Sequence, residues 1–196
     1  FDGKYLFYVS SGLTNNLYIS GNGVNWVNTP VAGLPPNVIL QSITAFNNKL
    51  YLVNEKGLIY SSTDGVSWTG ANPGVAGYTI ENLYFVLDNQ LWGLFRQDAN
   101  SKYYFATTQD GLTWQIGETI PSKFPIVDYA ALVFSSRTNK PKGLIIGGNA
   151  SDSTLLSSKW SVQKEINNKY KWVDFSKDKP DLTALSGASL IHYDNR

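Results

Sequence analysis

The chain has 196 residues, of which 42% are hydrophobic and 16% are charged, with a formal net charge of +1. This composition supports a globular core, and a near-neutral charge without any basic run argues against nucleic-acid binding. No apolar stretch approaches the roughly 18 residues of a membrane-spanning helix. The absence of cysteine excludes disulfides, a thiol nucleophile and a cysteine-ligated zinc site.

The first part of the chain predicts β-strands and no helix. Residues 4–9 and 17–19 are rich in aromatic and β-branched side chains, which favour strands. An Asn-Gly pair then predicts a turn, and Trp26 begins the return strand. Residues 29–36 contain three prolines and a glycine, so they are expected to form a loop.

The following segments repeat this order with one more strand in front. Residues 37–73 predict four strands, called a to d in chain order, with an Asn-Asn turn between a and b and an Asp-Gly corner between c and d. Residues 78–119 predict the same arrangement. Residues 120–181 predict a longer copy that lacks the Asp-Gly corner, and residues 182–196 begin one more unit with a strand a.

One pattern of seven residues recurs at 20–26, 62–68 and 108–114. It reads hydroxyl side chain, any residue, Asp or Asn, Gly, Val or Leu, any residue, Trp. The central pair predicts a hairpin turn because both residues tolerate positive φ, and the tryptophan supplies a large apolar side chain to the core. The predicted turn and anchor residues are Asn22, Gly23, Trp26, Asp64, Gly65, Trp68, Asp110, Gly111 and Trp114, with Trp172 as the anchor of the fourth unit.

The motif tryptophans stand about 40–50 residues apart, which is the length of a four-stranded propeller blade. The sequence therefore predicts an all-β fold, namely a β-propeller built of four-stranded antiparallel blades. A single domain is expected to span residues 1–196. Its predicted blades are residues 1–34 together with 182–196, residues 35–73, residues 74–119 and residues 120–181.

At these motifs the chain resembles two kinds of β-propeller. The Asp-Gly corners resemble the Asp-box repeats of sialidase-like propellers, although they are one residue shorter between Asp and Gly. The fourth unit resembles a kelch blade, because Gly147 and Gly148 close a strand and Trp160 and Trp172 follow. Mixed propellers of this kind resemble secreted or lipid-anchored surface proteins of Bacteroidetes. The resemblance implies an extracytoplasmic propeller, but it says little about activity because propellers host many functions.

Residues 1–4 and 193–196 both resemble an a–b turn. Two arrangements remain open from this observation. The favoured one is a segment of a larger ring of about six to eight blades. The alternative is a closed four-bladed ring, in which the last strand pairs with the first.

The acidic and arginine side chains are the candidates for catalysis. Asp64 and Asp110 are interpreted as turn residues, because Asn22 stands at the same position of the motif and is not a carboxylate. Sialidases, which the corners resemble, hold their substrate with three arginines. This chain has Arg96, Arg137 and Arg196. Arg137 and Arg196 are expected in or beside a–b turns, whereas Arg96 is expected at the far end of a strand b, and a strand of six residues spans roughly 20 Å. No catalytic residue, metal ion or cofactor is therefore assigned.

The two faces of the predicted disc differ. The a–b and c–d turns lie on one face, and the c–d corners are nearly identical in three blades. The b–c and d–a loops on the other face vary, and function tends to reside in variable loops on a rigid scaffold. We therefore predict that a protein or glycan partner binds the b–c/d–a face. The predicted contacts are Arg96, Gln97, Asp98, Lys123 and Phe124.

The sequence thus favours a non-catalytic binding propeller. Two alternatives remain open. The chain is either a segment of a sialidase-like or other glycan-processing enzyme, whose catalytic blades lie outside these residues, or a carbohydrate-binding lectin.

Overall fold

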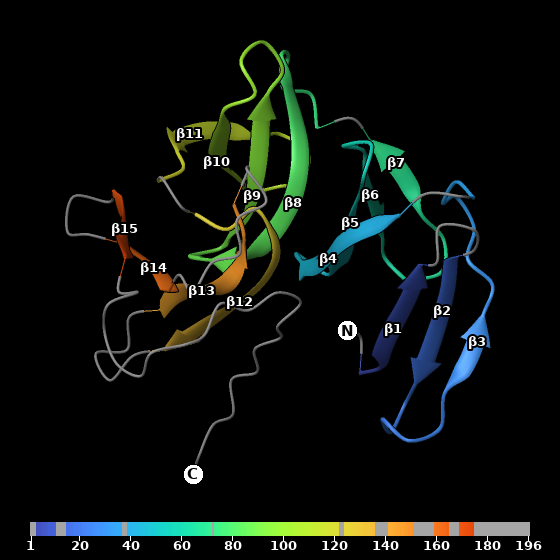
Figure 1. Ribbon diagram of the computed structural model, residues 1–196. Coiled ribbons are helices and arrows are strands. Elements are labelled where there is room, and N and C mark those ends of the chain that lie inside the picture. The colour runs from blue at the N-terminus through green and yellow to red at the C-terminus, as the bar shows by residue number, and fades with distance from the viewer. Residues whose placement is uncertain are drawn as a thin grey trace. The chain divides into compact units, whose positions relative to one another are not determined.

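The computed structural model describes residues 3–10, 15–36, 39–71, 73–121, 124–135, 141–150, 159–164 and 169–174. The regular structure in these ranges is β-strand, and the strands form antiparallel sheets in which sequence neighbours pair (Figure 1). Among the described residues, no helix has the length and hydropathy needed to cross a membrane.

The strands follow the predicted order. The first sheet contains β1 (Tyr5–Ser10), β2 (Asn15–Ser20) and β3 (Val27–Thr29). The second contains β4 (Leu40–Phe46), β5 (Lys49–Asn54), β6 (Ile59–Ser62) and β7 (Thr69–Ala71). The third contains β8 (Tyr78–Leu87), β9 (Gln90–Gln97), β10 (Tyr103–Thr108) and β11 (Gln115–Thr119). The fourth contains β12 (Val127–Ser135), β13 (Pro141–Asn149), β14 (Lys159–Lys164) and β15 (Tyr170–Asp174).

These sheets confirm the prediction of an all-β chain made of antiparallel four-stranded units. The first sheet supplies strands b, c and d of its unit. The strand a expected to complete it, within residues 182–196, lies outside the described residues.

The chain divides into two compact units. One comprises Phe1–Val86 and Gln90–Glu118, and it holds the first two sheets and nearly all of the third. The other comprises Leu87–Asn89 and Thr119–Arg196, and it holds the fourth sheet.

The tight two-residue turns lie between strands a and b. Asn47 and Asn48 have φ angles of 48° and 56°, and Asp88 and Asn89 have φ angles of 52° and 56°. Positive φ at both central residues is the requirement of a type I′ hairpin turn, which asparagine and aspartate meet more readily than other non-glycine residues. These four residues therefore set the a–b register.

The Asp-Gly corners are built differently from the prediction. Gly65 and Gly111 have positive φ angles of 78° and 83°, whereas Asp64 and Asp110 do not adopt positive φ. The expectation that both residues of the pair use positive φ is therefore wrong. The corner is a wider loop in which the aspartate side chain, rather than its backbone, forms the turn.

Apolar residues from neighbouring sheets form two clusters in the first unit. The cluster between the first and second sheets contains Leu6, Tyr8, Val31, Leu34, Leu40, Leu50, Leu52, Tyr60 and Trp68. The cluster between the second and third sheets includes Phe46, Tyr51, Val53, Ile59, Ile80, Leu83, Leu91, Phe95, Ala106 and Trp114. Trp68 and Trp114 are only 5% and 7% exposed, which matches their predicted role as core anchors.

Trp26 differs from these two tryptophans, because its side chain is 42% exposed. The prediction that it anchors the core is therefore wrong for the described residues. Trp68 is covered by Tyr8 and Leu6, which come from the sheet that precedes it in the chain.

The second unit has an aromatic core of its own. Phe124 is 1% exposed, and its ring lies 5.6 Å from that of Trp160 and 5.0 Å from that of Trp172, centroid to centroid. The prediction that Phe124 is exposed and contacts a ligand is therefore wrong. The residues around it read as a loop, but the two tryptophans of the fourth sheet give the phenylalanine an apolar site to fill.

Candidate functional site

The repeated corner was the first candidate for chemistry. In the second sheet, Ser62 Oγ accepts a hydrogen bond of 2.8 Å from the backbone N–H of Gly65. Asp64 Oδ1 accepts hydrogen bonds of 2.8 Å from the N–H groups of Val66 and Ser67 and one of 2.9 Å from the Ser62 hydroxyl. The Trp68 indole N–H donates to the Gly65 carbonyl at 3.1 Å.

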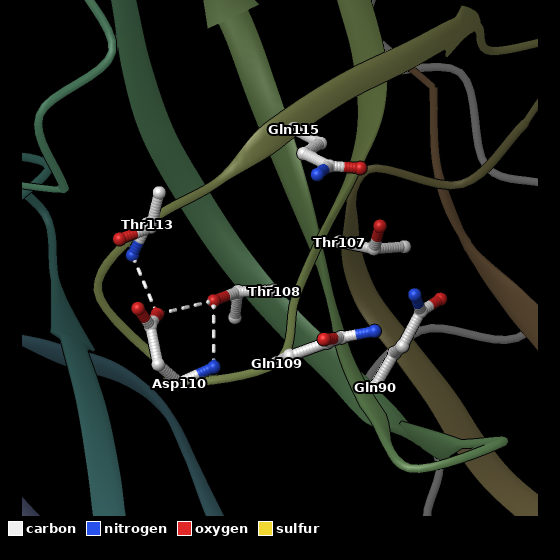
Figure 2. Close-up of a pocket in the computed structure, with 7 residues that line it drawn as sticks. All are labelled: Gln90, Thr107, Thr108, Gln109, Asp110, Thr113 and Gln115. Carbon is white, nitrogen blue, oxygen red and sulfur yellow. Dashed lines mark hydrogen bonds between the residues drawn. The ribbon is translucent and has the colours of Figure 1, made fainter.

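The same geometry recurs in the third sheet. Asp110 Oδ1 accepts from the N–H groups of Leu112 and Thr113 at 2.8 and 2.6 Å, and Thr108 Oγ1 accepts from the N–H of Gly111 at 3.0 Å. Figure 2 shows the bonds that join Asp110 to Thr113 and to Thr108. In the first sheet Asn22 Oδ1 accepts two backbone N–H bonds of 2.9 Å in the same way. An amide thus replaces the carboxylate without changing the turn.

The backbone N–H groups also set the charge of these carboxylates. They lower the pKa of Asp64 to about 2 and hold the pKa of Asp110 well below its usual range. A carboxyl group with so low a pKa does not carry a proton near neutral pH, so it is unsuited to general acid catalysis. Each of these aspartates is thus engaged in the hydrogen bonds of its own turn.

A cavity of about 500 Å³ lies at the opposite end of the second and third sheets. The b–c loop of the second sheet forms one wall, and the connection from β7 to β8 forms another. Its lining residues are Lys56, Gly57, Leu58, Gly74, Val75, Ala76, Gly77, Tyr78, Thr79 and Asp98. We call it the loop pocket. It lies on the b–c/d–a face that the sequence predicted to bind a partner.

The b–c loop is held by a buried asparagine. Asn54 Oδ1 accepts hydrogen bonds of 3.0 Å from the N–H groups of Lys56 and Leu58. Gly57, between them, has a φ of +69°, and a Cβ atom there would lie 2.2 Å from Thr79 Cγ2. Only glycine lets this loop lie against the start of β8, and the position of Lys56 and Leu58 at the pocket follows from that contact.

The other wall is fixed around Asp98. Its N–H donates to the Gly77 carbonyl at 2.9 Å, and its Oδ1 accepts from the Thr79 hydroxyl at 2.7 Å. Arg96 Nε lies 2.6 Å from Glu81 Oε1, and Arg96 Nη1 lies 4.0 Å from Asp98 Oδ1. Arg96 therefore stands between two carboxylates beside the pocket. The hydrogen bond that Arg96 Nε donates to Glu81 raises the pKa of the Arg96 guanidinium.

The side chain of Gln97 is engaged within its own loop. Gln97 Oε1 accepts from the Asn100 amide at 2.7 Å and from the Tyr104 hydroxyl at 3.2 Å. The ring of Tyr104 packs edge-on against that of Tyr78, with centroids 5.5 Å apart. Gln97 thus supports the aromatic residue that lines the pocket.

The structure brings together three of the five predicted ligand residues. Asp98 lines the loop pocket, and Arg96 and Gln97 lie beside it. Phe124 is buried in the other unit, and Lys123 lies outside the described residues. Lys56 and Leu58, which also line the loop pocket, are not among the residues predicted from the sequence. Their signal was the glycine between them, because a loop glycine often marks a close approach of two backbone segments.

The pocket offers groups of three kinds. Lys56 and Asp98 supply opposite charges, and Leu58, Val75 and Tyr78 supply apolar surface. Concave sites of this volume, with a few polar groups around an apolar lining, are typical of ligand binding. Within the described part of the chain, no group of three potential metal ligands is found.

Comparison with known proteins agrees with the β-propeller fold. A family model described as the DUF6242 beta propeller domain matches residues 1–196. Among solved structures, a GH32 beta-fructofuranosidase of Bombyx mori is similar, with a TM-score of 0.51, 12% identity and coverage of 92% of this chain and 47% of that one. A mutant of that enzyme in complex with sucrose gives a TM-score of 0.51 and 12% identity over 91% of this chain and 46% of that one. This chain thus spans about half the length of those enzymes. No curated protein matches it in sequence.

Proposed function

We propose that this chain, which belongs to the family of DUF6242 beta propeller domains, is a non-catalytic binding module that recognises a protein or glycan at the loop pocket. The observation that carries the proposal is the pocket of about 500 Å³ on the b–c/d–a face, where Lys56, Tyr78 and Asp98 converge. Its walls are held by hydrogen bonds within and between loops, so the site exists before a ligand arrives.

Preorganisation favours binding because less conformational entropy is lost when a ligand orders the site. The Asn54 hydrogen bonds hold Lys56, and the Thr79 hydroxyl and Gly77 carbonyl hold Asp98. Tyr78 provides a flat apolar surface for the face of a sugar ring or an apolar side chain. Asp64 and Asp110, by contrast, accept hydrogen bonds from the backbone of their own turns.

The proposal also includes a relation to Asp-box and kelch propellers and an extracytoplasmic location for the chain. The hydroxyl, the carboxylate or amide, and the tryptophan of each corner support a relation to Asp-box propellers, and the double glycine of β13 supports a kelch-like fourth blade. The likeness to secreted propellers supports an extracytoplasmic location for the binding module.

The test is a pair of arrays, one of glycans and one of peptides, probed with the whole chain. For any ligand found, Lys56→Ala and Asp98→Ala are expected to weaken binding about tenfold or more, as hot-spot residues do. Lys49→Ala is the matched control, since Lys49 begins β5 at the opposite end of the sheet. If Lys49→Ala abolished binding and the two pocket variants did not, the ligand would bind the a–b/c–d face, and the proposal would be wrong.

A second candidate function is a segment of a glycan-processing enzyme. It is favoured by the fold shared with the beta-fructofuranosidases, about half of whose length this chain spans. Glycosidases commonly use a pair of carboxylates, and Glu81 and Asp98 both lie beside Arg96. Sugar release by a preparation of this chain, abolished by Asp98→Asn with unchanged folding, would favour the enzyme over the binding module.

A further inference from the structure

A second cavity, of about 250 Å³, lies at the other end of the third sheet. It is lined by the first residue of β9, the last two of β10, the corner that follows them and the first residue of β11. These residues are Gln90, Thr107, Thr108, Gln109, Asp110, Thr113 and Gln115. Since β9 runs from Gln90 to Gln97, roughly 20 Å of strand separates this corner pocket from the loop pocket.

The glutamines of the corner pocket are specific to the third sheet. The pairing of Leu91 with Thr108 and of Leu50 with Ser62 aligns the third sheet with the second. In this alignment the motif residues Thr108, Asp110 and Thr113 fall opposite Ser62, Asp64 and Ser67. The three glutamine positions instead carry Lys49, Thr63 and Thr69 in the second sheet, and Lys4, Gly21 and Val27 in the first.

This contrast separates two roles within one corner. The hydroxyl, the aspartate or asparagine and the glycine recur in three sheets, and they make the same turn hydrogen bonds each time. The turn requires nothing of Gln90, Gln109 or Gln115, because the other sheets form it with a lysine, a glycine and a valine. A binding function is one reason for three amides to gather at this corner.

The polar groups of the corner pocket are available to a ligand. Figure 2 shows the side chains of Gln90, Thr107, Gln109 and Gln115 grouped on one side of β10. Among the described residues, these four side chains form no hydrogen bond with one another or with other groups. Each amide offers two donors and one acceptor, and the hydroxyl offers both functions. Such an array complements adjacent hydroxyl groups, each of which donates and accepts.

Charge and size narrow the class of ligand. The lining contains no lysine, arginine or histidine, and its one ionisable group is the Asp110 carboxylate, which the backbone keeps ionised. An anionic ligand would meet this negative charge with no cation to offset it. The cavity is also smaller than the 300 Å³ or more that is typical of drug-sized ligands, so it suits one small unit rather than a chain of several.

We propose that the corner pocket of the third sheet binds a single uncharged sugar residue through Gln90, Gln109 and Gln115. This site is independent of the loop pocket, and it does not depend on what the loop pocket recognises.

The experiment is a titration of the whole chain with glucose, galactose, mannose and fructose, each raised to about 100 mM and followed by the NMR signals of the glutamine side-chain amides. A site of this size is expected to bind with a Kd near the millimolar range. Gln90→Ala and Gln115→Ala should each weaken binding about tenfold. Gln97→Ala is the matched control, because Gln97 ends the strand that Gln90 begins, and it should leave the Kd unchanged.

The charge of the ligand is tested with two matched pairs. Glucuronate and galacturonate should bind about tenfold more weakly than glucose and galactose, because each adds a carboxylate. The proposal is overturned if no neutral sugar shifts the amide signals, if Gln97→Ala weakens binding as much as Gln90→Ala does, or if the uronates bind as tightly as the neutral sugars. Lys56→Ala and Asp98→Ala should not affect this titration, so failure here is distinct from failure at the loop pocket.

Discussion

The phenolic hydroxyl of Tyr51 donates a hydrogen bond of 2.9 Å to the backbone carbonyl of Asp110, 59 residues later in the chain. Tyr51 belongs to strand b of the second sheet, and Asp110 belongs to the corner of the third. The hydroxyl of Tyr8, in the first sheet, likewise donates to the carbonyl of Gly65 in the corner of the second. In both the first and the second sheet, a tyrosine thus donates a hydrogen bond to the corner of the following sheet.

Removing only this hydroxyl tests the contact. Tyr51→Phe keeps the ring, which is 1% exposed, and leaves the Asp110 carbonyl without its donor. The free energy of unfolding is expected to fall by about 1 kcal/mol, the usual net value of one hydrogen bond. Urea denaturation of the two proteins measures this difference. An unchanged midpoint would mean that water replaces the tyrosine at no cost.

The corner glycines give a second test, because two of them share a conformation but not their surroundings. Gly65 and Gly111 have φ angles of +78° and +83°. A Cβ atom at position 65 would lie 3.2 Å from the flexible end of Leu6, whereas one at position 111 would lie 2.2 Å from the ring of Tyr51.

Both substitutions by alanine carry the strain of positive φ, about 1–2 kcal/mol. Gly111→Ala must in addition displace a buried ring, so its total cost is expected to be about 3 kcal/mol or more. Gly65→Ala serves as the matched control for the backbone strain. Equal losses of unfolding free energy in the two variants would show that the ring of Tyr51 moves aside freely.

Local patterns sufficed to predict the strands and the corners. Many strands, such as β5 and β9, contain runs of apolar and aromatic residues bounded by turn residues. The spacing of Asp64, Gly65 and Trp68 indicates a turn whose hydrogen bonds all lie within the seven residues of the motif. The turn type was mistaken, because the motif does not reveal whether the aspartate contributes its backbone or its side chain.

Contacts between residues far apart in the chain could not be predicted from the sequence. The site of Phe124 is made by Trp160 and Trp172, which lie far along the chain, so a phenylalanine in a loop-like segment read as exposed. Asp98 was found because it follows a strand end on the variable face. Lys56 and Leu58 were missed because their place depends on the packing of Gly57 against Thr79.

The three motif tryptophans should differ in their contribution to stability. Trp68→Ala and Trp114→Ala remove side chains that are 5% and 7% exposed, so each is expected to cost about 3–5 kcal/mol. Trp26→Ala removes a side chain that is 42% exposed, so its cost should be about half as large or less, because stabilisation scales with the apolar area buried. Thermal or urea unfolding of the three variants ranks them. A loss at Trp26 as large as that at Trp68 would show that the indole is more deeply packed in solution.

The free energy of unfolding should fall in acid, over a pH range set by the pKa values of Asp64 and Asp110. The pKa of Asp64 is about 2 in the folded chain, against an ordinary value of 3.8, and the pKa of Asp110 is lowered in the same direction. Between these values the unfolded chain binds more protons than the folded one, so unfolding becomes more favourable as the pH falls. The stabilisation is complete above about pH 5 and is lost progressively as the pH falls from about 4 towards 2.

The double variant Asp64→Asn, Asp110→Asn isolates this effect. Asn22 shows that an amide oxygen accepts the same backbone hydrogen bonds, so the variant should fold, but neither side chain titrates. Its free energy of unfolding should fall less steeply between pH 4 and pH 2 than that of the parent chain, and the two curves should converge in acid. The remaining carboxylates titrate in both proteins and cancel from the comparison. Parallel curves over this window would show that the turn hydrogen bonds do not hold the carboxylates in their ionised form.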